Sequence, residues 1–221
     1  MYEQIGKRTI DICGFGLALI LLIPLLLLVS VAIKLDTRGS LFFLQDRVGR
    51  GGKIFKIIKF RTMKNFEDSF DLQGKELSNS KRITKVGRLL RRYSIDEIPQ
   101  LWNVFKGEMS LVGPRPMLPF QVERLSSSEK KRLLVRPGIT GLAQVNGRNS
   151  ISWQQKIEFD IEYVNRISFF LDISILIRTI KVVFSSEDIE FVVHDKYSLH
   201  ESSTLSDVGY KKDSEQGGSS K

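Results

Sequence analysis

The sequence is poor in the residues that build disulfide frameworks, histidine-based triads and soft-metal sites. Its 221 residues include one cysteine, Cys13, and two histidines, His194 and His200. A single cysteine excludes a disulfide framework within the chain. Both histidines lie in a polar C-terminal stretch, which argues against a Ser-His-Asp triad and a His/Cys zinc site. Acid–base or nucleophilic chemistry must therefore come mainly from Asp and Glu, and a bound metal would be a hard, oxygen-liganded ion such as Mg²⁺.

Negative charge is also scarce. The chain has 34 Lys and Arg against 25 Asp and Glu, a formal net charge of +9. This excess suits an anionic membrane, a nucleic acid or a phosphorylated substrate, and a solvated basic surface is the structural alternative. Aromatic residues are not interleaved with the basic ones as in single-strand-binding proteins. Together with the apolar N-terminus, this argues against a nucleic-acid partner.

Charged residues are absent from positions 12–33, which read ICGFGLALILLIPLLLLVSVAI. A membrane-spanning helix needs roughly 20 apolar residues, so the length fits. A cleaved signal peptide fits less well, because the apolar core is too long and no small-x-small site follows. Pro24 predicts a kink, since proline removes a backbone hydrogen bond and clashes with the preceding turn. A spanning helix and a re-entrant helix both remain open, and spanning is the commoner use of such a run.

The rest of the chain predicts an α+β domain that is mostly helical. Segments 41–47 and 53–61 are β-prone and flank the glycine-rich turn VGRGGK, which predicts a β-hairpin. Apolar spacing predicts a helix over Lys85 to Lys106 and a short amphipathic helix over 120–134. Residues 136–149 have the composition of a loop, and its length favours a functional one.

The C-terminal part divides into an apolar-rich stretch and a polar tail. Residues 151–184 fit either a pair of core helices or an amphipathic helix at a membrane interface. The tail, 185–221, has too few apolar residues to offset the entropy of ordering and is predicted to be largely disordered. The predicted organisation is therefore a membrane helix at 1–36, a catalytic domain at 37–184 and this tail.

The sharpest candidate for chemistry is RRYSIDEIPQLWN at 91–103, where Asp96 and Glu97 are adjacent. Neighbouring helical residues point about 100° apart, so one carboxylate can attack while the other orients a metal ion. The structural alternative is a capping box between Ser94 and Glu97 at a helix start. The two interpretations are compatible, because a helix N-terminus also binds phosphate.

Three further segments carry cations suited to phosphate groups or a base. Arg115 lies between two prolines, which stiffen the backbone that presents its guanidinium. Lys59 and Arg61, in KFRTM, share one strand face and are suited to flank a pyrophosphate. A bent connector and a charge-protected strand edge are the structural alternatives. The glycine-rich loop adds side chains able to contact a base: Arg136, Gln144, Asn146, Arg148 and Asn149.

Taken in order, these motifs resemble those of bacterial sugar transferases. The motifs are KRTID at 7–11, an apolar helix with Pro24, KFRTM, GRLLRRYSIDEIPQLWNVFKGEMSLVGPRP and VRPGITGLAQVNGRN. The chain resembles the small monotopic phosphoglycosyl transferases, with a closer likeness, through WQQKIEFDIEYV, to the diacetylbacillosamine-phosphate transferases. The resemblance implies a re-entrant helix and a catalytic domain on the cytoplasmic face of the bacterial inner membrane. It reverses the preference for spanning.

The resemblance also implies roles for individual residues. Asp96 matches the nucleophile and Glu97 its partner in an acidic dyad, with Mg²⁺ nearby, and Pro24 matches the helix-breaking proline. The family often has Ser-Pro at the break, whereas this chain has Ile23 before Pro24. The implied substrate-binding residues are Lys7, Arg8 and Asp11 at the membrane boundary, Arg88, Arg91 and Arg115 around the phosphates, Lys59 and Arg61 in a matching motif, and Arg148 near the uridine. We add Arg136 from the same loop as Arg148.

The implied reaction moves a sugar-1-phosphate from a UDP-sugar to polyprenyl (undecaprenyl) phosphate and releases UMP. It would proceed through a covalent aspartyl-phosphosugar and begin the membrane stage of glycoconjugate or polysaccharide assembly. The implied partners are the UDP-sugar, the polyprenyl phosphate and the phospholipid membrane, and a homodimer is open. Alternatives are the same chemistry with galactose or glucose for capsule, a non-catalytic membrane scaffold that binds nucleotide-sugars, and a membrane-anchored nucleic-acid-binding protein.

Overall fold

The computed structural model describes residues 2, 6–65, 69, 77–147 and 150–184. All of them belong to one compact unit, Met1–Ile189. The predicted tail at 185–221 and the candidate base-binding residues Arg148 and Asn149 lie outside the described residues.

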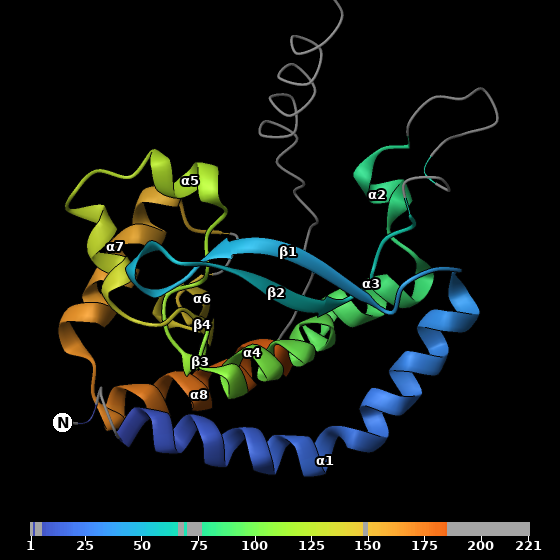
Figure 1. Cartoon of the computed structure of the whole chain (residues 1–221), viewed down its shortest axis with the longest axis horizontal. Helices are drawn as coiled ribbons and strands as arrows, with labels where there is room; N and C mark the ends of the chain where they lie inside the picture. Colours follow the sequence, from blue (N-terminus) through green and yellow to red (C-terminus); the bar gives the residue numbers. More distant parts are fainter. Residues whose placement is uncertain (1, 3–5, 66–68, 70–76, 148–149, 185–221) are drawn as a thin grey trace, which may run out of the picture. The chain divides into compact units, whose positions relative to one another are not determined.

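The apolar run forms α1, Lys7–Asp36, which is 30 residues long and contains Pro24. Its ribbon is bent rather than straight (Figure 1), as expected for a helix with an internal proline. By length and composition it is the one helix, among the described residues, that could cross a membrane. Its buried residues lie at its two ends, and its middle is exposed and apolar; the buried set is Lys7, Asp11, Phe15, Val29 and Ile33. Both ends of α1 are therefore packed on the domain.

The predicted hairpin is confirmed. Strands β1, Phe42–Val48, and β2, Ile54–Phe60, pair antiparallel in a two-stranded sheet. The short 3₁₀ turn η2, Arg50–Gly52, joins them, with Gly51 and Gly52 at φ of 65° and 81°. Such backbone angles favour glycine, so the glycines serve the turn.

The prediction of one continuous helix over Lys85–Lys106 is wrong. The chain forms α3, Lys85–Arg92, then the 3₁₀ helix η3, Ile95–Gln100, and then α4, Leu101–Lys106. The break is at Ser94, whose φ of 56° lies in the left-handed region. Its side chain makes no capping bond, so the predicted capping box is not formed. The break leaves the acidic pair on the short η3.

Smaller elements replace the helix predicted over 120–134. The chain forms α5, Pro119–Glu123, and the 3₁₀ helix η4, Glu129–Leu134, with a turn between them. This turn is stabilised by the Ser126 amide, which donates to the Glu129 carboxylate at 2.8 Å. A further short helix, α2, Asn79–Arg82, precedes α3.

A second sheet was not predicted. Strand β3, Ser110–Val112, pairs in parallel with β4, Gly138–Thr140, and α6, Leu142–Val145, follows directly. The stretch predicted as a loop over 136–149 thus contains a buried strand and a helical turn. Three-residue strands are too short to produce an alternating apolar pattern, which explains why the sequence does not predict this sheet.

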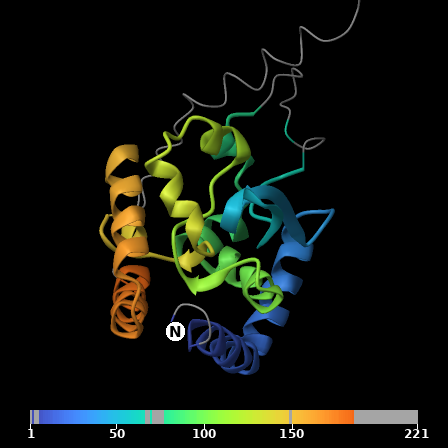
Figure 2. The ribbon, with the colours of Figure 1, turned by 60° about the vertical axis from the view of Figure 1, so that its left-hand side comes forward.

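Residues 151–184 form two helices, α7, Trp153–Arg166, and α8, Phe169–Phe184. They run along one side of the unit, beside β3, β4 and α6 (Figure 2). Tyr163 of α7 and Ile175 of α8 are buried in the core with Val112 of β3. The core-helix interpretation is therefore confirmed for one face of the pair. The opposite face of α8 stays apolar and exposed, with Phe170 at 82% and Phe184 at 79%.

Candidate active site

Three segments bring their polar side chains together around η3. Glu97 Oε1 accepts hydrogen bonds from Lys59 Nζ on β2 at 2.8 Å and from Arg115 Nη2 at 2.6 Å. Glu97 Oε2 accepts from Arg115 Nη1 at 3.3 Å, so the arginine binds the carboxylate with two nitrogens. Both Glu97 oxygens are thus held by cations. Bidentate pairing of this kind fixes geometry as well as charge.

Asp96, the neighbour of Glu97, has no such clamp. Its side chain is buried, at 8% exposed. Within the described ranges, no donor forms a hydrogen bond or ion pair with its carboxylate. Arg91 lies near enough to influence it electrostatically, but its Nε donates to Thr62 Oγ1 at 2.8 Å. The Asp96 carboxylate is therefore surrounded by positive charge and still available for an external partner.

The two carboxylates differ in acidity. Burial raises the pKa of Asp96 from 3.8 to about 6, opposed by Lys59 and reinforced by Glu97. Burial also acts to raise the pKa of Glu97, but Arg115 and Lys59 outweigh it and hold that pKa well below its usual range. Adjacent acids whose environments separate their pKa values are suited to different tasks. Glu97 is a permanent anion, and Asp96 is a carboxylate that burial has made more basic.

The loop that carries Arg115 is fixed along its backbone. Carbonyls of three residues in the segment accept hydrogen bonds from separate parts of the chain: Pro114 from Gly138 N at 2.9 Å, Arg115 from Arg132 Nη2 at 2.7 Å, and Met117 from Val48 N at 2.9 Å. The flanking prolines fix φ on either side of Arg115. Arg115 thus reaches Glu97 from a backbone that has little freedom to move.

The structure brings together five of the predicted site residues: Asp96, Glu97, Lys59, Arg91 and Arg115. Lys59 belongs to the group because β2 packs against η3. Burial lowers the pKa of Lys59, opposed by Glu97, whereas Glu97 raises the pKa of Arg115. These five form the candidate active site.

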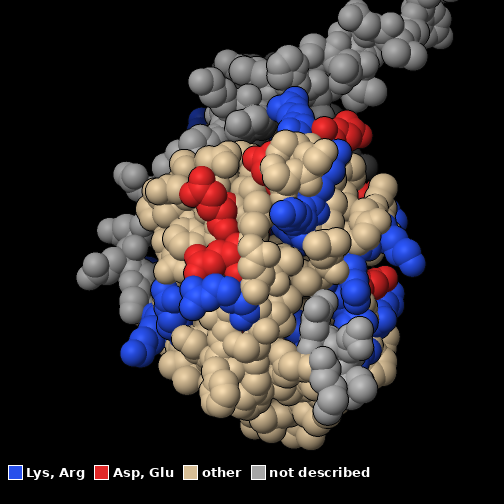
Figure 3. All heavy atoms as spheres, turned by 90° about the vertical axis from the view of Figure 1, so that its left-hand side faces the viewer, with Lys and Arg blue, Asp and Glu red and all other residues tan. Residues whose placement is uncertain are grey.

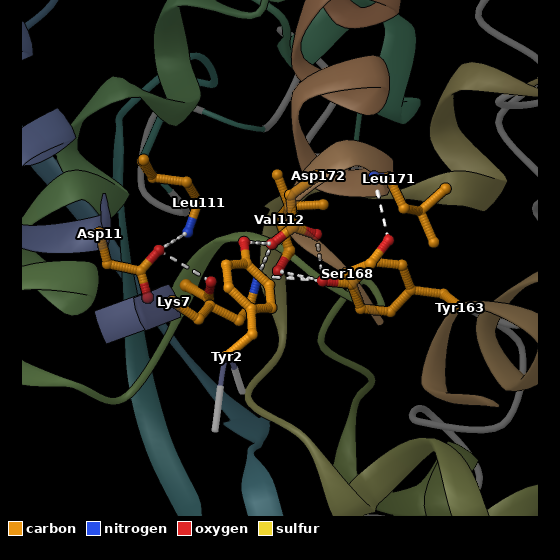
Figure 4. Close-up of polar contacts among 10 residues, drawn as sticks. Tyr2, Lys7, Asp11, Leu111, Val112, Tyr163, Ser168, Leu171 and Asp172 are labelled. Carbon is orange, nitrogen blue, oxygen red and sulfur yellow. Dashed lines mark hydrogen bonds and ion pairs between the residues drawn. The ribbon is translucent and has the colours of Figure 1, made fainter. Parts of the chain in front are cut away.

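Lys7 and Asp11 of the KRTID motif lie elsewhere, at the start of α1 (Figure 4). Lys7 Nζ donates to Asp172 Oδ2 at 2.6 Å and to the Tyr163 hydroxyl at 2.9 Å, and both members of the ion pair are almost fully buried. Asp11 Oδ1 accepts from Ser110 Oγ and from the Leu111 amide, each at 2.9 Å. In this structure Lys7 and Asp11 join α1 to α8 and β3, and neither contacts Asp96 or Glu97.

The remaining predicted cations are also engaged or distant. Arg8 donates to the Val104 and Phe105 carbonyls at 2.6 and 2.7 Å, near the C-terminal end of α4. Arg61 donates to carbonyls of the turn after α1, including Thr37 O at 2.9 Å. Arg136 Nε donates to Gly107 O at 3.0 Å, and Arg88 is exposed on α3. Their proposed substrate contacts stay predictions.

Sequence reasoning missed residues that support the Arg115 loop. Arg132 of η4 forms a buried ion pair with Asp160 of α7, in addition to its bond to the Arg115 carbonyl. Arg47 of β1 donates to the Pro116 carbonyl at 3.3 Å. A single charged residue within an apolar pattern, such as Asp160 among Ile157, Ile161 and Val164, is the signal that marks a buried charge, and buried charges require partners.

Mg²⁺ was expected beside the acidic pair. Among the described residues, no group of three or more His, Cys, Asp and Glu side chains could hold a metal ion. Mg²⁺ in phosphoryl-transfer sites commonly takes one or two carboxylates and completes its shell with substrate phosphates and water. Asp96 has carboxylate oxygens without protein donors, so the residues present fit an ion shared with a bound diphosphate.

Comparison with known proteins agrees with the resemblance. A sequence model of the bacterial sugar transferase family matches residues 2–186. The chain is 44% identical over 191 residues to the uncharacterized sugar transferase EpsL of Bacillus subtilis, covering 86% of this chain and 93% of that protein. It is 40% identical over 193 residues to the UDP-glucose:undecaprenyl-phosphate glucose-1-phosphate transferase of Caulobacter vibrioides, covering 84% and 72%. It is 38% identical over 200 residues to the UDP-galactose-lipid carrier transferase of Erwinia amylovora, covering 82% and 41%. The chain belongs to the bacterial sugar transferase family and is a transferase.

Proposed function

We propose that this transferase moves a sugar-1-phosphate from a UDP-sugar to polyprenyl (undecaprenyl) phosphate and releases UMP. Relatives named for undecaprenyl phosphate and for nucleotide-sugars, at about 40% identity, support the substrate classes. The observation that carries the proposal is the contrast within the acidic pair. Glu97 is held by Lys59 and Arg115, whereas Asp96 is buried among the same cations without a hydrogen-bond donor from the described chain.

Asp96 is the proposed nucleophile. Its carboxylate oxygen attacks the β-phosphorus, the atom that bears the sugar, and the bond from that phosphorus to the bridging oxygen breaks with its electron pair on UMP. A polyprenyl phosphate oxygen then attacks the phosphorus of the aspartyl-phosphosugar and frees the Asp96 carboxylate. Carboxylates form such intermediates in other phosphoryl-transfer enzymes. The raised pKa of Asp96 makes its carboxylate more basic, which favours attack.

The remaining residues of the site position and neutralise charge, which is the main requirement of phosphoryl transfer. Glu97 keeps Lys59 and Arg115 charged and correctly oriented. The exposed half of Arg115 is available to a phosphate oxygen. Arg91 adds further positive charge near Asp96. When bound, Mg²⁺ would be held by the Asp96 carboxylate and would neutralise the diphosphate. Glu97, also expected as a ligand, has both oxygens occupied by Lys59 and Arg115.

We further propose that α1 is a re-entrant helix and not a spanning one. Its N-terminal part contacts β3 and α4, and its C-terminal part packs Val29 and Ile33 against Phe60 and Leu90. A straight spanning helix would place its ends about 30 Å apart on opposite sides of the hydrocarbon layer, where one domain contacts only one end. A bent helix with both ends on the same domain satisfies these contacts.

The membrane-facing surface follows from the same arrangement. In Figure 3, charged atoms gather on the upper and middle parts of the face, and its lower end, where α1 and α8 lie in Figure 1, is uncharged. Moving a polyprenyl chain from the bilayer into water costs about 0.8 kcal/mol of free energy per CH₂ group. The chain therefore stays in the bilayer, and the enzyme must bind its phosphate at the membrane surface. We therefore place the apolar sides of α1 and α8 in the cytoplasmic leaflet of the bacterial inner membrane, with the domain on the cytoplasmic face.

The sugar is a separate question. Relatives at comparable identity are named for glucose and for galactose, and the resemblance in WQQKIEFDIEYV favours diacetylbacillosamine. Glucose and galactose are therefore the first donors to test for polysaccharide assembly, with diacetylbacillosamine beside them.

The test is UMP release from this panel of UDP-sugars by the full-length protein in detergent micelles, with and without undecaprenyl phosphate. We expect one donor to give UMP and a lipid-linked sugar, and Asp96→Asn to abolish both while membrane association persists. Radiolabelled donor should leave a covalent adduct on the wild-type protein. Donor binding without UMP release would support a non-catalytic scaffold, and near-normal turnover by Asp96→Asn would reject the nucleophile.

A further inference from the structure

Two cations next to the Arg115 loop have no task in the chemistry above. Arg47 of β1 donates from Nη1 to the Pro116 carbonyl at 3.3 Å and from Nη2 to Gln45 Oε1 at 2.7 Å. Lys156 lies in the first turn of α7 and is half-buried. In the part of the chain that the structure describes, no Asp or Glu forms an ion pair with either side chain. Partly buried cations without an anion are unfavourable, so they indicate an anion from outside the protein.

The geometry directs both cations to the same place. Asp160 follows Lys156 by four residues and therefore lies on the same face of α7. Asp160 pairs with Arg132, and Arg132 Nη2 donates to the Arg115 carbonyl at 2.7 Å. Arg47 reaches the same loop one residue later, at the Pro116 carbonyl. Arg47 thus contacts the Arg115 loop directly, and Lys156 lies on the face of α7 that holds Arg132 against the same loop.

Two further observations agree with this placement. Burial and then Arg115 lower the pKa of Lys156, and the same two causes lower the pKa of Arg47 to about 10, opposed by Glu97. Lys156 also lies at the positive end of the α7 dipole, where a cation is disfavoured. An anion bound between Arg115, Arg47 and Lys156 would offset the repulsion between these cations and the unfavourable interaction of Lys156 with the helix dipole.

We propose that Arg47 and Lys156, together with the exposed side of Arg115, form a subsite for a phosphate monoester, occupied by the α-phosphate of the nucleotide donor as it leaves as UMP. This inference rests on the proposed function. As Asp96 bonds to the β-phosphorus, the electron pair of the breaking bond passes to the bridging oxygen. The α-phosphate then changes from a singly charged group to a monoester carrying about −1.5 to −2. Cations placed there stabilise charge that develops only as the bond breaks, which accelerates the step.

The acceptor, polyprenyl phosphate, also ends in a phosphate monoester. The position of the subsite favours the nucleotide, because it lies on the Arg115 loop and α7 and none of its three residues is on the membrane helix α1. The experiment must nevertheless separate the two sources, since both anions carry the same group.

The test is equilibrium binding of UMP and of uridine to the full-length protein in detergent micelles, in wild type and in the Asp96→Asn background, where no reaction is required. We expect Lys156→Gln and Arg47→Gln each to weaken UMP binding about tenfold, the usual loss for one charge-assisted hydrogen bond, and to leave uridine binding unchanged. Lys156→Arg and Arg47→Lys, which keep the charge, should retain most of the UMP affinity. The matched controls Lys131→Gln and Arg50→Gln, at exposed positions on η4 and η2, should not change it.

Three results would overturn the assignment. The first is unchanged UMP affinity in folded Lys156→Gln and Arg47→Gln proteins. The second is an equal loss of UMP and uridine binding, which would place the effect in the nucleoside pocket or the fold. The third is unchanged UMP binding with a raised KM for polyprenyl phosphate, which would assign the subsite to the acceptor. Turnover by Asp96→Asn would refute the covalent mechanism but would not change the measured UMP affinities. Failure of the proposed mechanism can therefore be distinguished from failure of the proposed subsite.

Discussion

Asp96 and Glu97 are consecutive in the chain, yet only Glu97 is ion-paired. Lys59 and Arg115 hold Glu97 at 2.8 and 2.6 Å, whereas the Asp96 carboxylate is buried beside it without a donor from the described residues. The 3₁₀ geometry of η3 and the left-handed Ser94 turn the two side chains to different surroundings. The same pair of acids therefore supplies an oriented anion and an available carboxylate.

The first prediction concerns pH. Asp96 must be deprotonated to attack, and burial raises its pKa to about 6. The rate of UMP release in the first half-reaction should therefore be constant above pH 7 and fall about tenfold for each pH unit below 6. Burst measurements between pH 5 and 8 would check this. A burst rate that stays constant down to pH 5, in protein that remains folded, would contradict the assignment.

The second prediction separates activity from stability at the same position. A raised pKa means that the folded state binds the Asp96 proton more readily than the unfolded state. The charged form therefore weakens folding at pH 7, and this penalty is lost progressively as pH falls from about 6 to 3.8. The shift from 3.8 to about 6 corresponds to about 3 kcal/mol. Asp96→Asn should therefore raise the melting temperature at pH 7 while abolishing turnover.

Glu97→Gln is the counterpart and should act in the opposite direction. The pKa of Glu97 is depressed, so its charge stabilises the folded state above its unfolded pKa, and this contribution is lost as pH falls. The variant should lower the melting temperature at pH 7, because Lys59 and Arg115 lose their anion. Thermal unfolding of both variants in one detergent would compare them directly, and a shift of the same sign in both would refute the contrast.

The third prediction concerns the ion pair that docks the start of α1. Lys7 and Asp172 are 2.6 Å apart, with side chains only 6% and 5% exposed. Lys7→Met leaves a buried, unpaired carboxylate and should cost about 3–5 kcal/mol of unfolding free energy. Lys7→Met combined with Asp172→Leu should recover part of this loss.

The exposed pair Lys56 and Asp46 is the matched control for the Lys7 pair. Its side chains are 65% and 54% exposed, so Lys56→Met should cost less than about 1 kcal/mol. Thermal or denaturant unfolding of the four proteins would give the values. A Lys7→Met loss no larger than the Lys56→Met loss would show that the buried pair contributes little.

The fourth prediction tests the path of α1 in the membrane. In a Cys13→Ser background, single cysteines at Thr9, Leu35 and Lys53 would be labelled with a membrane-impermeant thiol reagent in intact and opened cells. Leu35 is 83% exposed at the end of α1, and Lys53 is on the hairpin turn as a reference for the domain. A re-entrant helix predicts that all three react only after opening. Labelling of Thr9 or Leu35 alone in intact cells would establish a spanning helix.

The sequence by itself determined the features that depend on local pattern. The charge-free run with Pro24 predicts a bent apolar helix, the glycines between two β-prone segments predict a hairpin, and the adjacent Asp96 and Glu97 mark the place of chemistry. Each of these requires only neighbours in the chain. The family resemblance depended on the same contiguous motifs, and the match over residues 2–186 agrees with it.

The tertiary structure decided which charges meet. Lys59 and Arg115 are 38 and 18 residues from Glu97 and still bind the same carboxylate, while Lys7 pairs with Asp172, 165 residues away, and not with the acidic pair. Nothing in the local sequence distinguishes these lysines, because a long flexible side chain takes whichever partner packing brings near it. Only the folding of β2, η3 and the Arg115 loop onto one another made Glu97 a clamped anion and left the Asp96 carboxylate available.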